Sequence, residues 1–379
     1  MTKSGKKVIC YVSASAGDWG GASRVLFSNI RLLDRSRFEP VVLLPTAGPV
    51  VALLQHLGVA HVIWGRLHEP GGVVEYARNV FLAAKLLKEH RVDLLHINHS
   101  NYWRPAEVVA ARLLRIPIVT HYHVVVDEPG PFVRLSSRIV AVSSFTADHS
   151  LPRSVPKVVV HNAVTLERFD SAVDIRGELG LSPEDIVVSF IGQVRAIKGI
   201  DLFLRMTREI DAGNVRFLIA GECRDPARFE GAYSEERLRA EIGNDPRVKY
   251  VGYRSDVENV YRASDIIVLP SRSAEPFGLI NIEAGAAYRP IVASCAGGVP
   301  EIVQNGENGL LFDPGDGASL VRNVKRLVED RQLREAMGTR ARRAVENNFT
   351  TKPVRALEAV YDGLIRCHPG AEPSKVGDP

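Results

Sequence analysis

The chain has 379 residues, which is more than one ordinary hydrophobic core organises and enough for two domains. Hydrophobic residues make up 45% of it and charged residues 24%, as in ordinary soluble globular proteins. The formal net charge of +4 gives no overall signature of a nucleic-acid binder, and the longest apolar runs, such as 116–119 and 266–269, are far too short to span a membrane.

In chain order, short apolar runs alternate with patterns of three- and four-residue periodicity. Helical patterns cover, for example, 23–33 and 76–90. Strand-like runs in the first half lie at 7–13, 40–44, 60–64, 92–97, 116–121, 139–143 and 157–161. Those in the second half lie at 186–192, 215–221, 248–251, 266–270, 291–294 and 309–312.

This alternation predicts an α/β protein with parallel sheets wound by right-handed crossovers. A polar stretch at 165–184 separates the two series and is predicted to be a linker with a short helix. We therefore expect two doubly wound, Rossmann-like domains facing a cleft, at 1–168 and 169–352, with ligands at the carboxyl ends of the strands. The tail 368–379 is rich in proline and glycine and is predicted to be disordered.

The N-terminus resembles a signal peptide because Lys3, Lys6 and Lys7 precede an apolar run, but that run is too short for one. A first buried strand is the better interpretation. The four cysteines are widely spaced and lack metal-ligand spacing, so free thiols in the reducing cytoplasm are expected; they are Cys10, Cys223, Cys295 and Cys367.

The first loop with chemical potential is 15–23, between the first strand and the first helix. Its paired Gly20 and Gly21 allow a ligand to approach the backbone closely, and a helix N-terminus favours an anion. The alternative is a plain strand–helix turn, since the loop is neither a dinucleotide fingerprint nor a Walker loop.

The second loop is 190–199, where Gln193, Arg195 and Lys198 follow a strand end and precede a helix. Lysine supplies a point charge and arginine a bidentate donor, so a diphosphate fits this loop. The alternative is a solvated basic turn.

The third stretch is 271–283, which follows the strand at 266–270. Glu275 lies ahead of a helix predicted to begin near Phe277 or Gly278, and Glu283 lies within that helix. The amides of Phe277, Gly278 and Leu279 are predicted to face the cleft unpaired, where phosphate can accept their hydrogen bonds. Carboxylates accept sugar and ribose hydroxyls, so the two acids suit two hydroxyl-rich parts of one ligand. The alternatives are helix capping by Glu275 and a solvated Glu283.

The fourth site is the strand end at 118–123, with His121 and His123, and His96 and His99 stand at a neighbouring one. Histidines there can be ligands, bases or hydrogen-bond donors, although a lone histidine is more often structural. No paired aspartates supply oxygen ligands, so no metal is expected.

These stretches together resemble the retaining glycosyltransferases of the GT-B fold, in family four. The strongest part is SRSAEPFGLINIEAGAAYRPIVASCAGGVPE at 271–301, which is similar to the family's two glutamates eight residues apart and its following Gly-Gly-x-Pro-Glu loop. GGA at 20–22, IKG at 197–199 and HNAVTLERF at 161–169 match other signatures in the same order.

The resemblance implies roles for single residues. Glu275 would accept hydroxyls of the donor sugar, Glu283 would hold the ribose, and Lys198 would neutralise the diphosphate. His123 would contact the transferred sugar. Two groups would bind the donor through backbone: Gly20 with Gly21, and Phe277 with Gly278 and Leu279. The resemblance also implies that the helix 353–367 packs back on the first domain, and that transfer needs no metal and no cofactor beyond a UDP- or GDP-sugar.

Four positions depart from the family pattern. Gln193 stands where an arginine is frequent, which puts diphosphate affinity in question unless Arg195 replaces it. Pro276 and Arg289 stand at positions where the family often has glycine, and so does Ala163.

The leading hypothesis is a retaining hexosyltransferase that acts on a carbohydrate or lipid-linked acceptor in bacterial cell-surface polysaccharide or glycoconjugate synthesis. Two other enzyme classes, a sugar-nucleotide epimerase and a phosphorylase, fit the motifs less well. A nucleotide-sugar-binding scaffold with weakened catalysis is the non-enzyme alternative, motivated by Gln193.

The expected location is cytoplasmic, with peripheral contact at the inner face of the membrane as a further hypothesis. Basic segments at 102–115 and 131–138 form a partly apolar face that could touch anionic lipid. A solvated helix face is the more frequent explanation of such a pattern. The arginines concerned are Arg104, Arg112, Arg115, Arg134 and Arg138.

Overall fold

The computed structural model describes residues 5–13, 15, 21–65, 72–98, 105–126, 128–149 and 151–366. The chain divides into two compact units. Unit 1 comprises Met1–Ala163 and Thr351–Pro379, and unit 2 comprises Val164–Thr350. The division falls at 163/164, where the sequence analysis places it at 168/169.

Unit 1 is built on a seven-stranded parallel sheet with the order β3-β2-β1-β4-β5-β6-β7. Its strands are β1 (Lys7–Val12), β2 (Phe38–Leu44), β3 (Ala60–Ile63), β4 (Leu94–Ile97), β5 (Ile118–Tyr122), β6 (Arg138–Ala141) and β7 (Lys157–Val159). Its helices are α1 (Gly21–Leu32), α2 (Pro49–His56), α3 (Val73–Glu89), α4 (Ala106–Leu113), η1 (Pro131–Leu135), α5 (Ser144–His149) and α13 (Thr351–Arg366).

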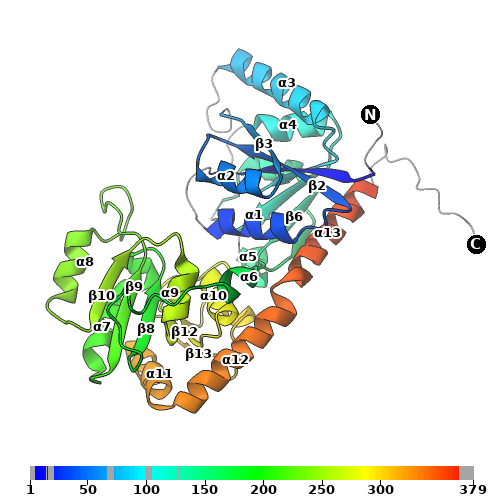
Figure 1. The fold of residues 1–379 in the computed structure, drawn as a ribbon. Helices are drawn as coiled ribbons and strands as arrows, with labels where there is room; N and C mark the ends of the chain where they lie inside the picture. The colour runs from blue at the N-terminus through cyan, green and yellow to red at the C-terminus, as the bar shows by residue number, and fades with distance from the viewer. Residues whose placement is uncertain are drawn as a thin grey trace, which may run out of the picture. The chain divides into compact units, whose positions relative to one another are not determined.

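Both faces of this sheet are buried, as the continuous apolar strands predict. On β1, Ile9 and Tyr11 face one core together with α1, α2 and α13, whereas Cys10 and Val12 face a second core with α3 and α4. The C-terminal helix α13 lies beside α1 although they are at opposite ends of the chain (Figure 1).

Unit 2 repeats the design with a six-stranded parallel sheet of order β10-β9-β8-β11-β12-β13. Its strands are β8 (Ile186–Ile191), β9 (Val215–Ala220), β10 (Val248–Gly252), β11 (Ile266–Leu269), β12 (Ile291–Ser294) and β13 (Gly309–Phe312). Its helices are α6 (Glu167–Asp170), η2 (Ala196–Lys198), α7 (Ile200–Glu209), α8 (Glu235–Ile242), α9 (Val257–Ala263), α10 (Leu279–Ala286), η3 (Val299–Glu301), α11 (Gly317–Glu329) and α12 (Arg331–Asn348). The prediction of two doubly wound parallel sheets is confirmed.

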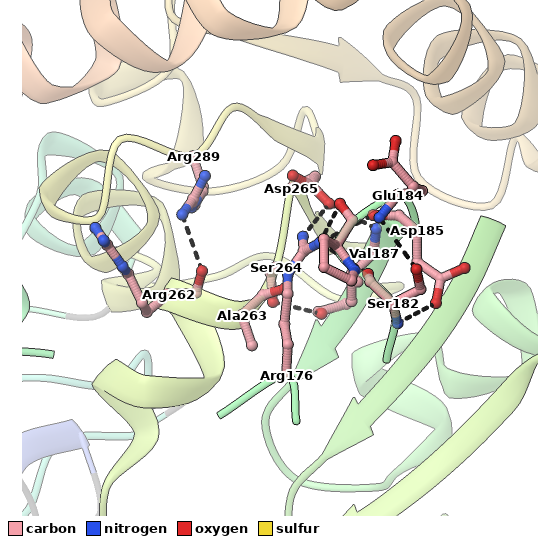
Figure 2. Close-up of polar contacts among 12 residues, drawn as sticks. Arg176, Ser182, Glu184, Asp185, Val187, Arg262, Ala263, Ser264, Asp265 and Arg289 are labelled. Carbon is pink, nitrogen blue, oxygen red and sulfur yellow. Dashed lines mark hydrogen bonds and ion pairs between the residues drawn. The ribbon is translucent and has the colours of Figure 1, made fainter. Parts of the chain in front are cut away.

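A half-buried arginine fastens the polar linker to the amino ends of the strands of unit 2 (Figure 2). Arg176 donates from Nε to the Ala263 carbonyl at 3.0 Å, from Nη1 to the Asp185 carbonyl at 3.0 Å and from Nη2 to Asp265 at 2.6 Å. Asp265 also accepts from the amide of Val187, the second residue of β8. The linker is therefore part of the unit 2 structure, at the edge of the sheet opposite the strands' carboxyl ends.

The unusual Arg289 is accommodated by backbone carbonyls. Its guanidinium donates to the Tyr261 carbonyl oxygen at 3.2 Å and to the Arg262 carbonyl oxygen at 2.9 Å, the second of which is drawn in Figure 2. Burial lowers the pKa of Arg289. The preceding Tyr288 takes a left-handed backbone conformation with φ of 59°, a conformation that glycine adopts more readily. The left-handed residue is thus Tyr288 and not Arg289, so the position before Pro290 does not itself require a glycine.

Within the described residues, every helix is too short or too polar to cross a membrane. The same residues contain no group of three or more histidine, cysteine, aspartate or glutamate side chains placed to hold a metal ion.

Candidate functional site

The candidate site of unit 2 lies at the carboxyl ends of β8 and β11, which are neighbours at the centre of the sheet. Strands β9 and β10 continue the sheet on one side of this pair, and β12 and β13 continue it on the other. The connections after β8 and β11 therefore leave in opposite directions, which creates the crevice where doubly wound sheets bind ligands.

Two backbone segments meet there at very short range because one residue is a glycine. Gly199 follows η2 and has a φ of 76°. A Cβ atom on it would lie 1.8 Å from the carbonyl oxygen of Pro270, the residue after β11. Only glycine permits this approach, which brings Lys198 against the segment 271–275.

Lys198 and Glu275, predicted separately as ligands of phosphate and sugar, contact each other. Lys198 Nζ lies 2.6 Å from Oε1 and 2.9 Å from Oε2 of Glu275. The Ser271 hydroxyl donates a further hydrogen bond to Glu275 Oε1. The glutamate side chain is 8% exposed and the lysine side chain 29% exposed, so the lysine head remains within reach of a ligand.

A second loop holds the backbone of Glu275 in place. The Gly298 amide donates to the Glu275 carbonyl at 2.8 Å, and Glu275 forms an isolated parallel bridge with Gly297. Gly297 has a φ of 67°, and a Cβ atom on it would lie 2.1 Å from the Glu275 carbonyl oxygen. The Gly-Gly-Val-Pro-Glu loop after β12 is therefore a support for the carboxylate, a role the sequence analysis did not assign.

Helix α10 begins at Leu279, later than the predicted start near Phe277 or Gly278. Gly278 adopts a left-handed conformation with φ of 86°, and no side chain caps the helix. The amides of Gly278 and Leu279 donate to no acceptor among the described residues, so this N-terminus can accept an anion. The Phe277 ring packs edge-on against Phe349 at 6.0 Å between centroids, which anchors the segment in the core.

Glu283 is buried inside unit 2, and plain solvation is wrong for it. Its Oε2 accepts a 2.8 Å hydrogen bond from the hydroxyl of Tyr261 on α9. Tyr261 is fully buried and is a partner that spacing along the chain could not reveal, because 22 residues separate the two.

In the basic loop after β8, Arg195 and Gln193 differ in their hydrogen bonding. Arg195 donates from Nη2 to the Glu230 carbonyl at 2.9 Å, which engages one of the five N–H donors of its guanidinium. Gln193 is partly exposed and makes no hydrogen bond within the described structure.

A cavity of about 540 Å³ opens beside the site at the carboxyl ends of β9 and β10. Tyr253 lines it and is 53% exposed, and the hydroxyl of Tyr250, also in its wall, donates to the Gly221 carbonyl at 3.0 Å. An exposed aromatic ring in a pocket of this size suits a planar ligand group. The sequence analysis missed Tyr253.

His123 belongs to unit 1, at the carboxyl end of β5. Its Nε2 lies 2.8 Å from Oδ1 of Asn98, and its ring lies 4.2 Å from that of His121. His121 in turn contacts His96 at 5.4 Å between ring centroids. His96 Nδ1 lies 2.7 Å from the hydroxyl of Tyr361 on α13. The structure thus makes His96 and His121 buried structural residues whose rings meet edge-on, with His123 against the ring of His121.

Some of the predicted positions lie outside the described residues. Gly21 is exposed and is the first residue of α1, whereas Gly20 lies outside the described residues. His99 and Arg104 also lie outside them. The predicted closure of the glycine loop on a diphosphate therefore stays a prediction.

Sequence comparison finds two family models in the order of the two units. Residues 19–168 match Glycosyltransferase Family 4, and residues 173–344 match Glycosyl transferases group 1. A D-inositol 3-phosphate glycosyltransferase of Mycobacterium sp. (strain JLS) is 31% identical across 69% of this chain, which spans 64% of that relative's length. A protein of the same name from Salinispora arenicola is 27% identical across 93% of this chain and 89% of that relative's length.

Solved structures share the fold at low identity. A glycosyltransferase from Rickettsia africae superposes with a TM-score of 0.83 at 21% identity, over 96% of this chain and 99% of that chain. Anabaena HepE in complex with UDP and glucose superposes with a TM-score of 0.76 at 22% identity, over 94% and 99%. The fold of the two units is accordingly the GT-B fold. From these matches and the order of its motifs, the chain belongs to the group 1 glycosyltransferases of family 4.

Proposed function

We propose that the protein is a retaining hexosyltransferase that uses a nucleotide-diphosphate sugar and needs no metal ion. The observation that carries the proposal is the cluster of Lys198, Glu275 and Ser271 at the carboxyl ends of β8 and β11, beside the uncapped N-terminus of α10. A cation, a carboxylate and free amides within one crevice suit a ligand that combines phosphate with sugar hydroxyls.

In the proposed complex, Lys198 turns from Glu275 to the diphosphate and offsets the negative charge that grows on the leaving group. Glu275 is then free to accept sugar hydroxyls, and the amides of Gly278 and Leu279 donate to phosphate or sugar. The backbone at Phe277 sets the direction of these donors. Glu283 would hold the ribose hydroxyls. The hydrogen bond from the Tyr261 hydroxyl would keep the carboxylate in position.

The reaction we propose retains the configuration at the sugar carbon. The bond between that carbon and the diphosphate oxygen breaks, and the acceptor oxygen bonds to the same face. The acceptor proton passes to the departing phosphate. His123 would contact the sugar near this carbon, and Gly20 and Gly21 would approach the diphosphate from unit 1.

For the nucleotide we propose UDP before GDP. The support is the fold shared with HepE, which binds UDP, together with the cavity beside Tyr253, where a base ring has an exposed aromatic partner. The arginine missing at Gln193 predicts modest diphosphate affinity unless Arg195 reaches the diphosphate with donors other than the one engaged by the Glu230 carbonyl.

For the acceptor we propose a carbohydrate or a lipid-linked sugar in bacterial cell-surface polysaccharide or glycoconjugate synthesis. A phosphorylated polyol is a second candidate, favoured by the relatives named D-inositol 3-phosphate glycosyltransferase. The two are distinguished by offering each acceptor with the same donor and measuring product formation.

Peripheral contact with the inner face of the membrane is a further part of the proposal. Phe81 on α3 and Leu113 on α4 are largely exposed, and basic residues such as Lys85 and Arg112 lie on the same two helices. Exposed apolar groups among cations suit an anionic lipid surface. Sedimentation with anionic and with neutral vesicles tests this, and equal binding to both would contradict it.

The first experiment is a thermal-unfolding scan against UDP-, GDP-, ADP- and TDP-sugars. A ligand at 100 times its dissociation constant adds about 2.7 kcal/mol to the free energy of unfolding. We expect one nucleotide class to raise the melting temperature. We also expect Lys198→Ala to abolish the shift and Lys325→Ala, an exposed lysine on α11, to retain it. A shift retained in Lys198→Ala would contradict the phosphate role.

Turnover then separates the alternative functions. A transferase forms a glycoside from the responding donor, an epimerase converts the sugar without an acceptor, and a phosphorylase requires inorganic phosphate. A binding scaffold shows the thermal shift with no product across an acceptor panel. We expect transfer to continue in excess EDTA, and loss restored by magnesium or manganese would contradict metal independence.

A further inference from the structure

Asn98, the residue after β4, joins three parts of unit 1 through its backbone and its side chain. It is 2% exposed. Its backbone nitrogen donates to the Val12 carbonyl at the end of β1, at 3.0 Å. Its Nδ2 donates to the carbonyl of Ala22 in the first turn of α1, at 3.0 Å. Its Oδ1 lies 2.8 Å from Nε2 of His123.

These contacts determine the orientation of the Asn98 amide. The Ala22 carbonyl can only accept a hydrogen bond, so the nitrogen of the amide must face it. The oxygen of the amide then faces His123, and this oxygen also only accepts. The hydrogen in this contact is therefore on Nε2 of His123, and whenever the ring is neutral Nδ1 is its acceptor nitrogen.

The histidine stack behind His123 gives this hydrogen bond its importance. Burial lowers the pKa of His96 to about 3 and that of His121 well below its ordinary range, so both rings are neutral. Neither nitrogen of His121 has a hydrogen-bond partner among the described residues. The His121 ring therefore packs against His123 and does not select its tautomer. The hydrogen bond to Asn98 selects the tautomer.

We infer that Asn98 is a positioning residue that sets the tautomer and orientation of His123 and ties it to the first turn of α1. The Asn98 side chain thereby couples the position of His123 to the position of the first turn of α1, which follows the glycine loop. The consequence for catalysis rests on the proposed function, in which His123 contacts the transferred sugar. The assignment of the tautomer does not depend on that function.

Nuclear magnetic resonance of ¹⁵N-histidine-labelled full-length protein tests the geometry without any substrate. His123 is assigned by the signal lost in His123→Gln. We expect a protonated Nε2 whose hydrogen exchanges slowly in the parent protein and rapidly in Asn98→Leu. A parent protein with the hydrogen on Nδ1, or an Nε2 hydrogen unaffected by Asn98→Leu, would overturn the inference.

A second variant serves if Asn98→Leu does not fold. Asn98→Asp keeps the shape and the acceptor for His123, loses the donor to the Ala22 carbonyl, and places a negative charge beside the ring. We expect it to keep the hydrogen on Nε2 and to move the titration midpoint of His123 upward by about one pH unit or more. An unchanged midpoint would contradict the contact.

Turnover with the responding donor tests the catalytic consequence. We expect Asn98→Leu to lower kcat by about tenfold or more, because a displaced group loses alignment, and to leave the donor KM within about twofold. Asn29→Ala, which removes a buried asparagine of α1 that does not contact His123, should leave kcat unchanged. A parent protein without any turnover would contradict the proposed function, whereas the spectra would still decide the role of Asn98; normal kcat in Asn98→Leu with altered spectra would overturn the catalytic part alone.

Discussion

At the scale of single residues, the candidate donor site is defined by a pair of opposite charges. Lys198 and Glu275 are 77 residues apart in the chain and contact at 2.6 Å. Without a ligand each offsets the charge of the other, so the crevice stores neither an uncompensated cation nor an uncompensated carboxylate. The pair has only modest value for stability because the lysine is partly solvated.

We therefore expect Glu275→Ala to separate activity from stability. Transfer should fall by about two to three powers of ten, because an interaction made in the transition state is lost. The melting temperature should change little. Glu209→Ala, an exposed glutamate at the end of α7, is the matched control. Turnover of Glu275→Ala at the parent rate would contradict the assignment.

A second residue, Glu107 on α4, predicts a pH dependence of stability that is independent of the site. It is fully buried, and its carboxylate accepts no hydrogen bond from another described residue. Burial raises its pKa to about 7. Between its ordinary pKa and about pH 7 the folded protein keeps a proton that the unfolded chain has released, so the free energy of unfolding falls as pH rises through this window.

Replacing Glu107 by glutamine removes that loss. We expect Glu107→Gln to raise the free energy of unfolding at pH 8 by about 1–3 kcal/mol, and by clearly less at pH 5. Urea unfolding of variant and parent at both pH values measures this. The difference between the two proteins is used because the buried His96 and His121 make the parent lose stability toward acid. Glu75→Gln, exposed on α3, should change neither value, and an equal effect of Glu107→Gln at both pH values would argue against a neutral carboxyl group.

At the scale of secondary-structure elements, the site depends on where helices begin rather than on their lengths. Helices α7 and α10 both start after a left-handed glycine, Gly199 and Gly278. In α7 the glycine also allows the close contact with the segment after β11. Helix starts of this kind direct the last residues of the preceding loop, among them Lys198, toward the carboxyl edge of the sheet.

Gly199→Ala should damage this junction severely. The new Cβ would lie 1.8 Å from the Pro270 carbonyl oxygen, and backbone cannot yield as a flexible side chain does. With the added strain of a φ of 76°, we expect a loss of more than about 2 kcal/mol in the free energy of unfolding and loss of donor binding. Gly213→Ala, where a Cβ would have no neighbour within 4 Å, should unfold like the parent. Similar unfolding of both variants would show that the close approach is not obligatory.

At the scale of the whole molecule, unit 1 is discontinuous in sequence. Helix α13 supplies Leu357 and Tyr361 to its core. Glu358 on the same helix accepts from the Asp34 amide at 2.8 Å, and Asp362 pairs with Lys7 at 2.6 Å. Unit 1 therefore cannot complete its fold until α13 is present.

Truncation after residue 350 should consequently affect the two units unequally. We expect calorimetry to show the unit 1 transition lost or moved to much lower temperature. The unit 2 transition should remain. Its temperature should still rise on addition of the donor nucleotide sugar, because Lys198, Glu275 and α10 all lie in unit 2. Truncation after residue 366, which retains α13, is the control. Two intact transitions without α13, or a donor effect lost together with α13, would contradict this division.

The sequence by itself determined the fold class and the family of this protein. Alternating apolar runs are enough to predict two parallel sheets, since a strand buried on both faces must be apolar throughout. The glutamates at 275 and 283, the Gly-Gly-Val-Pro-Glu loop and their order identify the family because these residues are close in the chain. The local position of Glu275 ahead of a helix and Glu283 within it was predictable for the same reason.

Contacts between distant segments were decided only by the tertiary structure. Periodicity and spacing describe neighbours along one element, and they contain no information on which loop ends meet across a sheet edge. The bond from Tyr261 to Glu283, the Lys198–Glu275 pair and the link from Asn98 to His123 each join separate loops or helices. The last two form because parallel strands bring their carboxyl ends to one edge, where side chains that the chain separates by tens of residues come within hydrogen-bond distance. Tyr261 and Glu283 meet because α9 and α10 pack against each other.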